Sequence, residues 1–184
     1  MRKASPGALA VLVALLPSFV FAQAAPPTPT KSSEVLNPAL QEAFKRAVET
    51  LKSSGGSVND RIVSLQDIGR YNVAVAVVAR SAGTSQSSLA HDRITEIYYV
   101  LRGTATQVTG TMVNGTRGER ASPTIGPTMS SSSPIQNAKS TRVGPGDVQI
   151  IPPGVAHGFT SIDPGGIDYL VFRIDPDHVL SVQP

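Results

Sequence analysis

The sequence predicts an all-β domain preceded by one helix. From residue 61 onward, short runs rich in Val, Ile, Thr and Tyr alternate with turns of Gly, Pro, Ser and Asp. Many short strands separated by turn residues are typical of sandwiches, barrels and jelly rolls. A single stretch of helical periodicity comes before them. The length of 184 residues, with 40% hydrophobic and 16% charged residues, suits one folded domain.

The first residues have the organisation of a signal peptide. Arg2 and Lys3 form a short positive region, an apolar run covers residues 8–21, and small residues that suit cleavage begin at Ala22. A membrane anchor is disfavoured, because the run is interrupted and is shorter than the roughly 20 apolar residues of a membrane span. We therefore expect residues 1–24 to be removed, leaving a periplasmic or secreted protein without a membrane span.

Charge and cysteine content exclude several classes of protein. Arg2 and Lys3 supply two of the three units of net positive charge, so the mature chain retains one (3 − 2). The sequence has no Lys/Arg cluster interleaved with aromatics, which argues against a nucleic-acid partner. It also has no cysteine, so disulfides, a lipoprotein anchor and thiol chemistry are excluded. Any metal must be held by imidazole and carboxylate groups.

Residues 25–58 are predicted to form a linker and the helix. The linker is rich in Pro, Ala and Thr. Asn37 is the expected N-cap and Pro38 the first helical residue, while Gly55-Gly56 ends the helix. Four apolar residues recur on one face: Leu40, Phe44, Val48 and Leu51. This face should pack against the β domain.

Residues 59–178 are predicted to form the β domain. Its expected strands are Arg61–Leu65, Tyr71–Arg80, Glu96–Leu101, Thr104–Val113, Val148–Ile151, His157–Ser161 and Tyr169–Ile174. Residues 114–146 interrupt the pattern, being dense in Ser, Gly, Pro and Thr. A segment of this length and composition is expected to be a flexible loop, with a functional role such as a lid as the alternative.

Two of the three histidines lie beside turn signals in the strand-rich region. Glu96 follows His91 by five residues, an odd spacing that would place their side chains on opposite faces of an unbroken strand. A turn or bulge through residues 92–94 would restore a common face. Together with His157, they would form a facial triad of two imidazoles and one carboxylate. Such a set suits Fe, Mn, Zn or Ni and leaves coordination positions open.

These residues fall within two motifs. Gly83-x5-Leu89-x-His91-x4-Glu96-x6-Gly103 resembles the first cupin motif, and Gly146-x5-Pro152-x-Gly154-x2-His157-x3-Ser161 resembles the second. With both motifs in order, the chain resembles the small exported single-domain cupins. The resemblance implies a double-stranded β-helix, which is a jelly-roll barrel, with the ligands pointing into its mouth. It also implies that His91, Glu96 and His157 are metal ligands, and it suggests a homodimer.

The chain departs from the cupin pattern at two positions. Leu89 stands where the family has its first histidine, and Ser161 stands where it has a terminal asparagine. Loss of the histidine turns a four-ligand site into a three-ligand site. The metal would then be held more weakly or be more open to a ligand. Gly103 and Gly154 are expected at turns, where they orient the ligands.

Some of these residues have simpler interpretations. His91 and His157 could be hydrogen-bonded polar residues in a metal-free barrel, and Glu96 could pair at the surface with Arg93 or Arg102.

Other polar residues are less defined by the sequence. Tyr98 shares parity with Glu96 and should face the interior, where it could pack in the core or act in catalysis. Gln107 and Arg173 lie on predicted strands, but their parity is not fixed. His178 is expected to be an exposed residue near the C-terminus.

Three functions remain open at the level of sequence. The first is a metal-dependent enzyme acting on a small molecule, with a dioxygenase favoured because oxygen activation at a facial triad needs no separate general base. The second is a non-catalytic envelope protein that binds a small ligand or a metal. The third is a structural or interaction protein with a vestigial cavity. The fold by itself does not choose among them.

Overall fold

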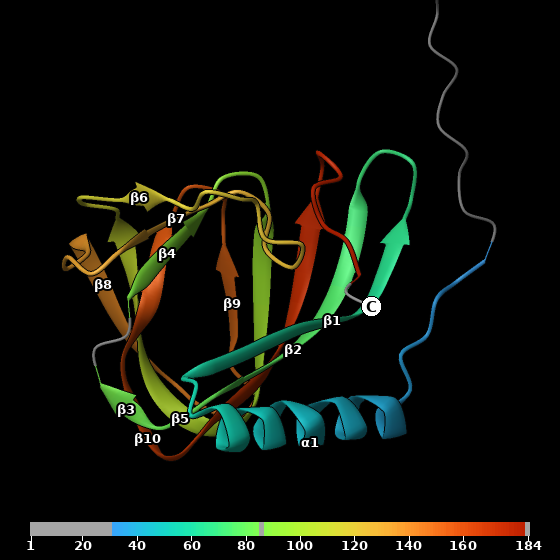
Figure 1. Cartoon of the computed structure of the whole chain (residues 1–184), viewed down its shortest axis with the longest axis horizontal. Helices are drawn as coiled ribbons and strands as arrows, with labels where there is room; N and C mark the ends of the chain where they lie inside the picture. The colour runs from blue at the N-terminus through green and yellow to red at the C-terminus, as the bar shows by residue number, and fades with distance from the viewer. Residues whose placement is uncertain (1–30, 85–86, 183–184) are drawn as a thin grey trace, which may run out of the picture.

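The computed structural model describes residues 31–84 and 87–182 and contains one helix and ten strands (Figure 1). The elements are α1 (Asn37–Ser54), β1 (Val58–Asp67), β2 (Asn72–Arg80), β3 (Gly83–Thr84), β4 (Ser88–His91), β5 (Thr95–Thr111), β6 (Thr116–Arg117), β7 (Thr128–Ser131), β8 (Gln136–Val143), β9 (Val148–Ile151) and β10 (Ala156–Asp175). The predicted signal peptide lies outside the described residues. Within them, no helix is both long and apolar enough to cross a membrane.

Two long strands organise the fold. β5 and β10 pair antiparallel with each other along most of their length, and each has different neighbours at its two ends. One half of this pair continues into β1, β2 and β9. The other half continues into β4, β6, β7 and β8. The ten-stranded sheet therefore folds over on itself as a jelly roll, which confirms the predicted all-β class with one N-terminal helix.

The bend in this strand pair depends on closely approaching glycines. The β5–β10 register shifts between Ile162 and Ile167, where the chain passes through Gly165 and Gly166 at positive φ. Opposite them, Gly103 has φ +79°, and a Cβ atom there would lie 2.0 Å from the Gly166 carbonyl oxygen. A side chain at residue 103 would thus clash with backbone at a position that already favours glycine. Gly103 is required where the sheet turns over.

Helix α1 covers the outer face of the β1–β2–β10 region, as Figure 1 shows. The predicted apolar face is confirmed, since Phe44 and Leu51 are buried and Leu40 and Val48 pack beside them. Gly55 ends the helix at φ +66°, with its N–H donating to the Leu51 carbonyl. The predicted cap at Asn37 was wrong by one residue. Leu36 is the N-cap and makes no side-chain capping bond, because Pro38 fixes the start of the helix.

The main core lies between the two halves of the folded sheet. Strand β2 separates the two environments by simple alternation: Ala74, Ala76 and Val78 face the interior, whereas Val77 and Ala79 face the helix. The interior cluster also holds Tyr98 and Tyr169. This interior contains the candidate site.

The segment 114–146 differs from the expected loop. It contains β6, β7 and the whole of β8, and β8 pairs with β5 while β7 pairs with β4. Ser- and Thr-rich strands form here because β8 lies at the edge of the sheet, where its side chains are mostly exposed and need not be apolar. Two pairs of expected strands are also continuous in the structure, as β5 and β10.

Candidate metal centre

Three strands bring the predicted ligands together. His91 is the last residue of β4, Glu96 is the second residue of β5, and His157 lies near the start of β10. The predicted break through residues 92–94 is present between β4 and β5, with the Asp92 N–H donating to the Pro127 carbonyl at 3.0 Å. One ligand atom from each side chain lies within 4.8 Å of the others. The sequence prediction of a shared face is therefore confirmed.

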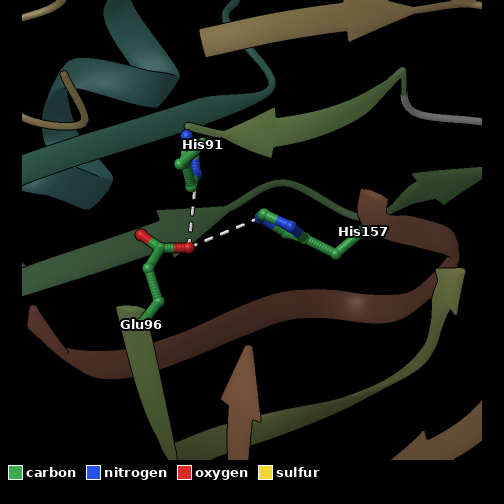
Figure 2. Close-up of side chains that lie close together, drawn as sticks. All are labelled: His91, Glu96 and His157. Carbon is green, nitrogen blue, oxygen red and sulfur yellow. Dashed lines mark ion pairs between the residues drawn. The ribbon is translucent and has the colours of Figure 1, made fainter. Parts of the chain in front are cut away.

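The three side chains converge on one carboxylate oxygen. Glu96 Oε2 lies 3.3 Å from His91 Nε2 and 3.4 Å from His157 Nε2. Figure 2 shows the two imidazole rings approaching this oxygen from different directions. All three residues are buried, with Glu96 only 1% exposed. The cluster is thus an internal site and not a surface group of ionisable residues.

The outer nitrogen of each imidazole is already engaged. His157 Nδ1 lies 3.0 Å from the Val155 carbonyl oxygen, which can only accept, so Nδ1 carries the proton. His91 Nδ1 lies 2.9 Å from Thr128 Oγ1, whose hydroxyl also lies 3.2 Å from the Gly126 carbonyl. That hydroxyl donates to the carbonyl and accepts from the histidine. Each Nδ1 is therefore engaged outside the centre, which leaves Nε2 of each ring as the nitrogen directed at Glu96 and able, in the neutral ring, to bind a divalent cation.

A buried ion-pair network orients Glu96. Arg173, only 1% exposed, donates from Nε to Glu96 Oε1 at 2.9 Å. Its other two nitrogens donate to Asp60 on β1, at 3.0 and 2.5 Å. Burial alone would raise the pKa of Glu96, but the Arg173 charge and the two histidines hold that pKa well below its ordinary value. Glu96 is therefore an anchored carboxylate with Oε2 turned toward the histidines.

Tyr98 is part of this arrangement. Its hydroxyl donates to Glu96 Oε2 at 2.9 Å, and its ring lies against His157 at 6.2 Å between centroids. Burial and then the nearby Glu96 carboxylate raise the pKa of Tyr98 well above its ordinary value. The prediction that Tyr98 faces the interior is confirmed. The residue is suited to donate a hydrogen bond, and it is poorly suited to act as a base.

A small cavity of about 100 Å³ opens beside the three ligands. Leu89, at the position of the missing histidine, lines one side of it, and its backbone pairs with His157. Thr124 and Ile125 from the segment before β7 cover another side. The remaining lining residues are Val58, Asp60, Arg80, Tyr98 and Tyr169. The cavity thus has polar and charged groups around the ligands as well as apolar ones.

A larger cavity of about 320 Å³ lies elsewhere, among residues of β4, β7, β8 and β10. Serines and apolar residues, among them Val108, Pro134, Ile135 and Phe159, make up most of its lining, which contains no titratable side chain. We place the chemistry in the smaller cavity because only that one has the His-Glu-His group.

The alternative partners considered for Glu96 are excluded. Arg93 pairs with Asp177 at 2.8 Å, and Arg102 pairs with Asp168 at 2.6 Å. His178 is exposed, as expected, and is not one of the residues of the described cluster.

Two buried polar residues were undefined at the level of sequence. Arg173 proves to be the partner of Glu96. Gln107 is also buried, and among the described residues neither atom of its amide has a hydrogen-bond partner. Asp60 and Thr128 were not identified from the sequence. They contact Arg173 and His91 and are not themselves proposed metal ligands, and no sequence motif marks such residues. Tyr169 and Arg173 lie on the same face of β10, because side chains alternate along a strand. The sequence alone did not show that this face is the inner one.

Comparison with known proteins supports the family. A family model described as cupin matches residues 42–183. No curated protein matches the chain.

Several solved structures are similar to this chain at low identity. A protein with a double-stranded β-helix domain from Klebsiella pneumoniae is 16% identical with a TM-score of 0.48, covering 83% of this chain and 93% of its own. KdgF from Halomonas sp. is 16% identical with a TM-score of 0.39, covering 66% and 82%. Oxalate decarboxylase from Bacillus subtilis is 18% identical with a TM-score of 0.44, covering 65% of this chain and 25% of its own.

Proposed function

This chain belongs to the cupin family, and we propose that it binds one divalent metal ion through His91, Glu96 and His157 and uses it in an enzymatic reaction on a small molecule. The observation that carries this proposal is the direction of the two histidines. Each Nδ1 is engaged by a group outside the site, so Nε2 of each ring is the nitrogen directed at the same carboxylate oxygen. Two imidazole nitrogens and a carboxylate oxygen directed at one point form a ligand set that a divalent cation can join.

A bound metal of this kind supplies Lewis-acid chemistry or, with iron, oxygen activation. The residues around it have positioning roles. Arg173 holds Glu96 through Oε1, so that Oε2 remains directed at the centre. Tyr98 donates to Oε2 and keeps its proton. The buried histidines and Leu89 keep bulk water away from one side of the cavity.

A dioxygenase is the reaction class that we favour. Among the described residues that line the cavity, Tyr98 keeps its proton and Asp60 is bound by both terminal nitrogens of Arg173. Neither is available as a general base. A reaction that needs no protein base therefore suits the site better than a hydrolysis or an isomerisation that depends on one.

A non-catalytic binding protein is the second candidate, and Leu89 favours it. The leucine stands beside the ligands where the family pattern has a further histidine, so the metal would have fewer protein ligands. A site of this kind can hold a metal or a small ligand without turnover.

We also propose that the protein is exported. The positive, apolar and small-residue regions of residues 1–24 support this proposal. N-terminal sequencing of protein recovered from the periplasm or the medium would test it. A mature end near residues 23–25 is expected, and an intact Met1 would contradict export.

The metal proposal is tested by measuring metal content. Wild-type protein is stripped with a chelator, reloaded separately with Fe²⁺, Mn²⁺, Zn²⁺ and Ni²⁺, desalted and analysed. One equivalent of at least one metal is expected for the wild type, and much less for His157→Ala. His178→Ala is the matched control, because it removes the exposed histidine, and it should retain wild-type loading. Equal loading of all three proteins would contradict the assigned site.

A further inference from the structure

We infer that the larger cavity, of about 320 Å³, is a second binding site and takes a small neutral molecule that carries several hydroxyl groups, such as a single sugar ring. This inference goes beyond the proposed function, because it needs neither the metal nor any residue of the metal centre. It is carried by the place of the cavity in the sheet, by the chemistry of its lining and by its size.

The floor of the cavity is one row of residues that crosses the sheet. The strand registers align this row from β8 through β5 and β10 to β4 and β7, and its members are Ser140, Val108, Gly158, Ser88 and Ser131. All five line the cavity, together with residues 132–135 of the connection between β7 and β8. The cavity is therefore built by five strands and one connection that meet only in the folded chain.

This row faces away from the metal centre. Gly158 follows His157 directly, and Ser88 directly precedes Leu89, so the alternation of side chains along a strand puts each pair on opposite faces. His157 and Leu89 line the small cavity, whereas Gly158 and Ser88 line the larger one. The two cavities share no lining residue among those described. A molecule can thus bind in the larger cavity without entering the metal centre.

Gly158 gives the floor its depth. Its φ lies outside the positive range, so the backbone conformation alone does not require glycine here. A Cβ atom at this position would lie 3.3 Å from the Ser87 carbonyl oxygen and 3.5 Å from the Ser88 Cα, with no other atom closer. A side chain would therefore nearly fit, and its absence leaves that space to the cavity.

The lining offers hydroxyl groups without charge. It holds five serines and one threonine, and none of the described residues that line it is ionisable. Within the described part of the chain, the hydroxyls of Ser132 and Ser140 have no hydrogen-bond partner, so each can donate or accept. The Ser133 hydroxyl accepts from Asn114 Nδ2 at 3.2 Å, which leaves its own proton to donate.

This mixture of donors and acceptors favours a ligand with hydroxyl groups of its own. Ser88 Oγ donates to the Ser131 carbonyl oxygen at 3.2 Å and keeps its lone pairs to accept from a ligand. A hydroxyl group both donates and accepts, so it matches either kind of partner. A charged ligand would find no opposite charge in the lining, and removing a charge from water without a partner is costly.

The size of the cavity suits one ring. Its volume of about 320 Å³ lies at the lower end of the roughly 300–1,000 Å³ that is typical of small-molecule sites. Since liquid water takes about 30 Å³ for each molecule, the cavity corresponds to about ten waters. A single sugar ring with its hydroxyls has a similar number of non-hydrogen atoms. Its carbon atoms would face apolar lining residues such as Val108 and Ile135.

The experiment is an NMR titration of the purified, isotope-labelled protein. D-glucose, D-galactose and D-mannose are each compared with the matching uronate, which adds one carboxylate to the same ring. We expect at least one sugar to shift the backbone amide signals of Ser88, Ser132 and Gly158 saturably within tens of millimolar. Its uronate should bind at least about tenfold more weakly.

Two variants with the same added side chain locate the binding. Ser140→Trp places a large ring at the cavity from an exposed strand position and should weaken sugar binding at least about tenfold. Lys139→Trp is the matched control, because residue 139 is the exposed neighbour on the other face of β8, and it should leave the affinity unchanged. Gly158→Ala, which adds a methyl group to the floor, should weaken binding severalfold. The same spectra report whether each variant is folded.

The remaining outcomes contradict the inference. No saturable shift with any of the three sugars would overturn it. Uronates that bind as tightly as the sugars would overturn the preference for a neutral ligand, and equal affinity in the Ser140→Trp and Lys139→Trp variants would overturn the assigned cavity. The titration needs no metal, so its failure would leave the metal centre standing. A protein that binds no metal would likewise leave this inference standing.

Discussion

The two faces of the C-terminal half of β10 are built from different chemistry. On the outer face, Leu170 and Phe172 pack with Phe44 and Val77 beneath the helix. On the inner face, Tyr169 and Arg173 are buried among polar partners, and Arg173 reaches Glu96 and Asp60. Neighbouring residues of one strand therefore belong to an apolar packing layer and to a charged network.

This difference separates stability from function. Apolar contacts on the outer face are non-directional and tolerate small shifts of the helix. The inner network depends on hydrogen-bond geometry, and each buried charge needs its partner. Changes under the helix should therefore lower stability alone, whereas changes on the inner face should also alter the metal centre.

The largest effect is expected from Arg173→Met. The variant leaves the carboxylates of Glu96 and Asp60 without their cation, and breaking a buried ion pair in this way costs about 3–5 kcal/mol. Denaturant unfolding of the metal-free protein would measure this loss. Arg102→Met is the matched control, because its pair with Asp168 involves an arginine that is mostly exposed. Equal losses in the two variants would contradict the special role of the inner network.

Phe44→Ala tests the outer face. Phe44 is 8% exposed and packs against Val77 and Leu170, so its removal should lower the free energy of unfolding by about 3 kcal/mol. Because it lies on the far side of the sheet from the ligands, metal affinity of the folded protein should be unchanged. A parallel fall in metal affinity would show that the two faces are coupled.

A smaller effect is expected from Thr128→Val. The substitution keeps the shape of the side chain and removes the hydroxyl that accepts from His91 Nδ1. Losing such an outer partner of a metal-binding histidine typically weakens metal binding about tenfold or more. Calorimetric titration with Zn²⁺ would measure it, with Thr116→Val at an exposed strand position as the control. Unchanged affinity would show that Thr128 does not set the tautomer of His91.

The smallest effect on stability is expected at the part of the outer face that the helix leaves open. Ile150 and Val148 on β9 are 67% and 59% exposed, so Ile150→Ser should change the free energy of unfolding by less than about 0.5 kcal/mol. If the homodimer expected from the family resemblance uses this patch, the variant should sediment as a monomer at concentrations where the wild type is dimeric. A wild type that is monomeric at all concentrations would contradict that use.

The three proposed metal ligands could be predicted from the sequence, because histidine is rare in this chain and the ligands fall within motifs of defined spacing. With only three histidines in the chain, His91 and His157 were conspicuous, and the turn after His91 explained how Glu96 joins them. The apolar face of α1 was equally clear, since periodicity alone defines it.

The partners of the ligands could not be predicted from local patterns. Asp60 and Arg173 are far apart in the sequence and meet only when β1 and β10 lie on either side of β2. Thr128 lies in a segment whose composition predicted a flexible loop, yet β7 and β8 form there by pairing with distant strands. Strand pairing of this kind depends on tertiary context more than on intrinsic propensity.

The most direct measurement is a calorimetric titration of Co²⁺ into metal-free wild-type protein and into Glu96→Gln. Glutamine keeps the size of the side chain but replaces the charged oxygen that both histidines face. We predict binding of one ion per chain to the wild type and affinity at least about a hundredfold lower in the variant. Equal affinity in the two proteins, or no binding to the wild type, would contradict a metal centre at His91, Glu96 and His157.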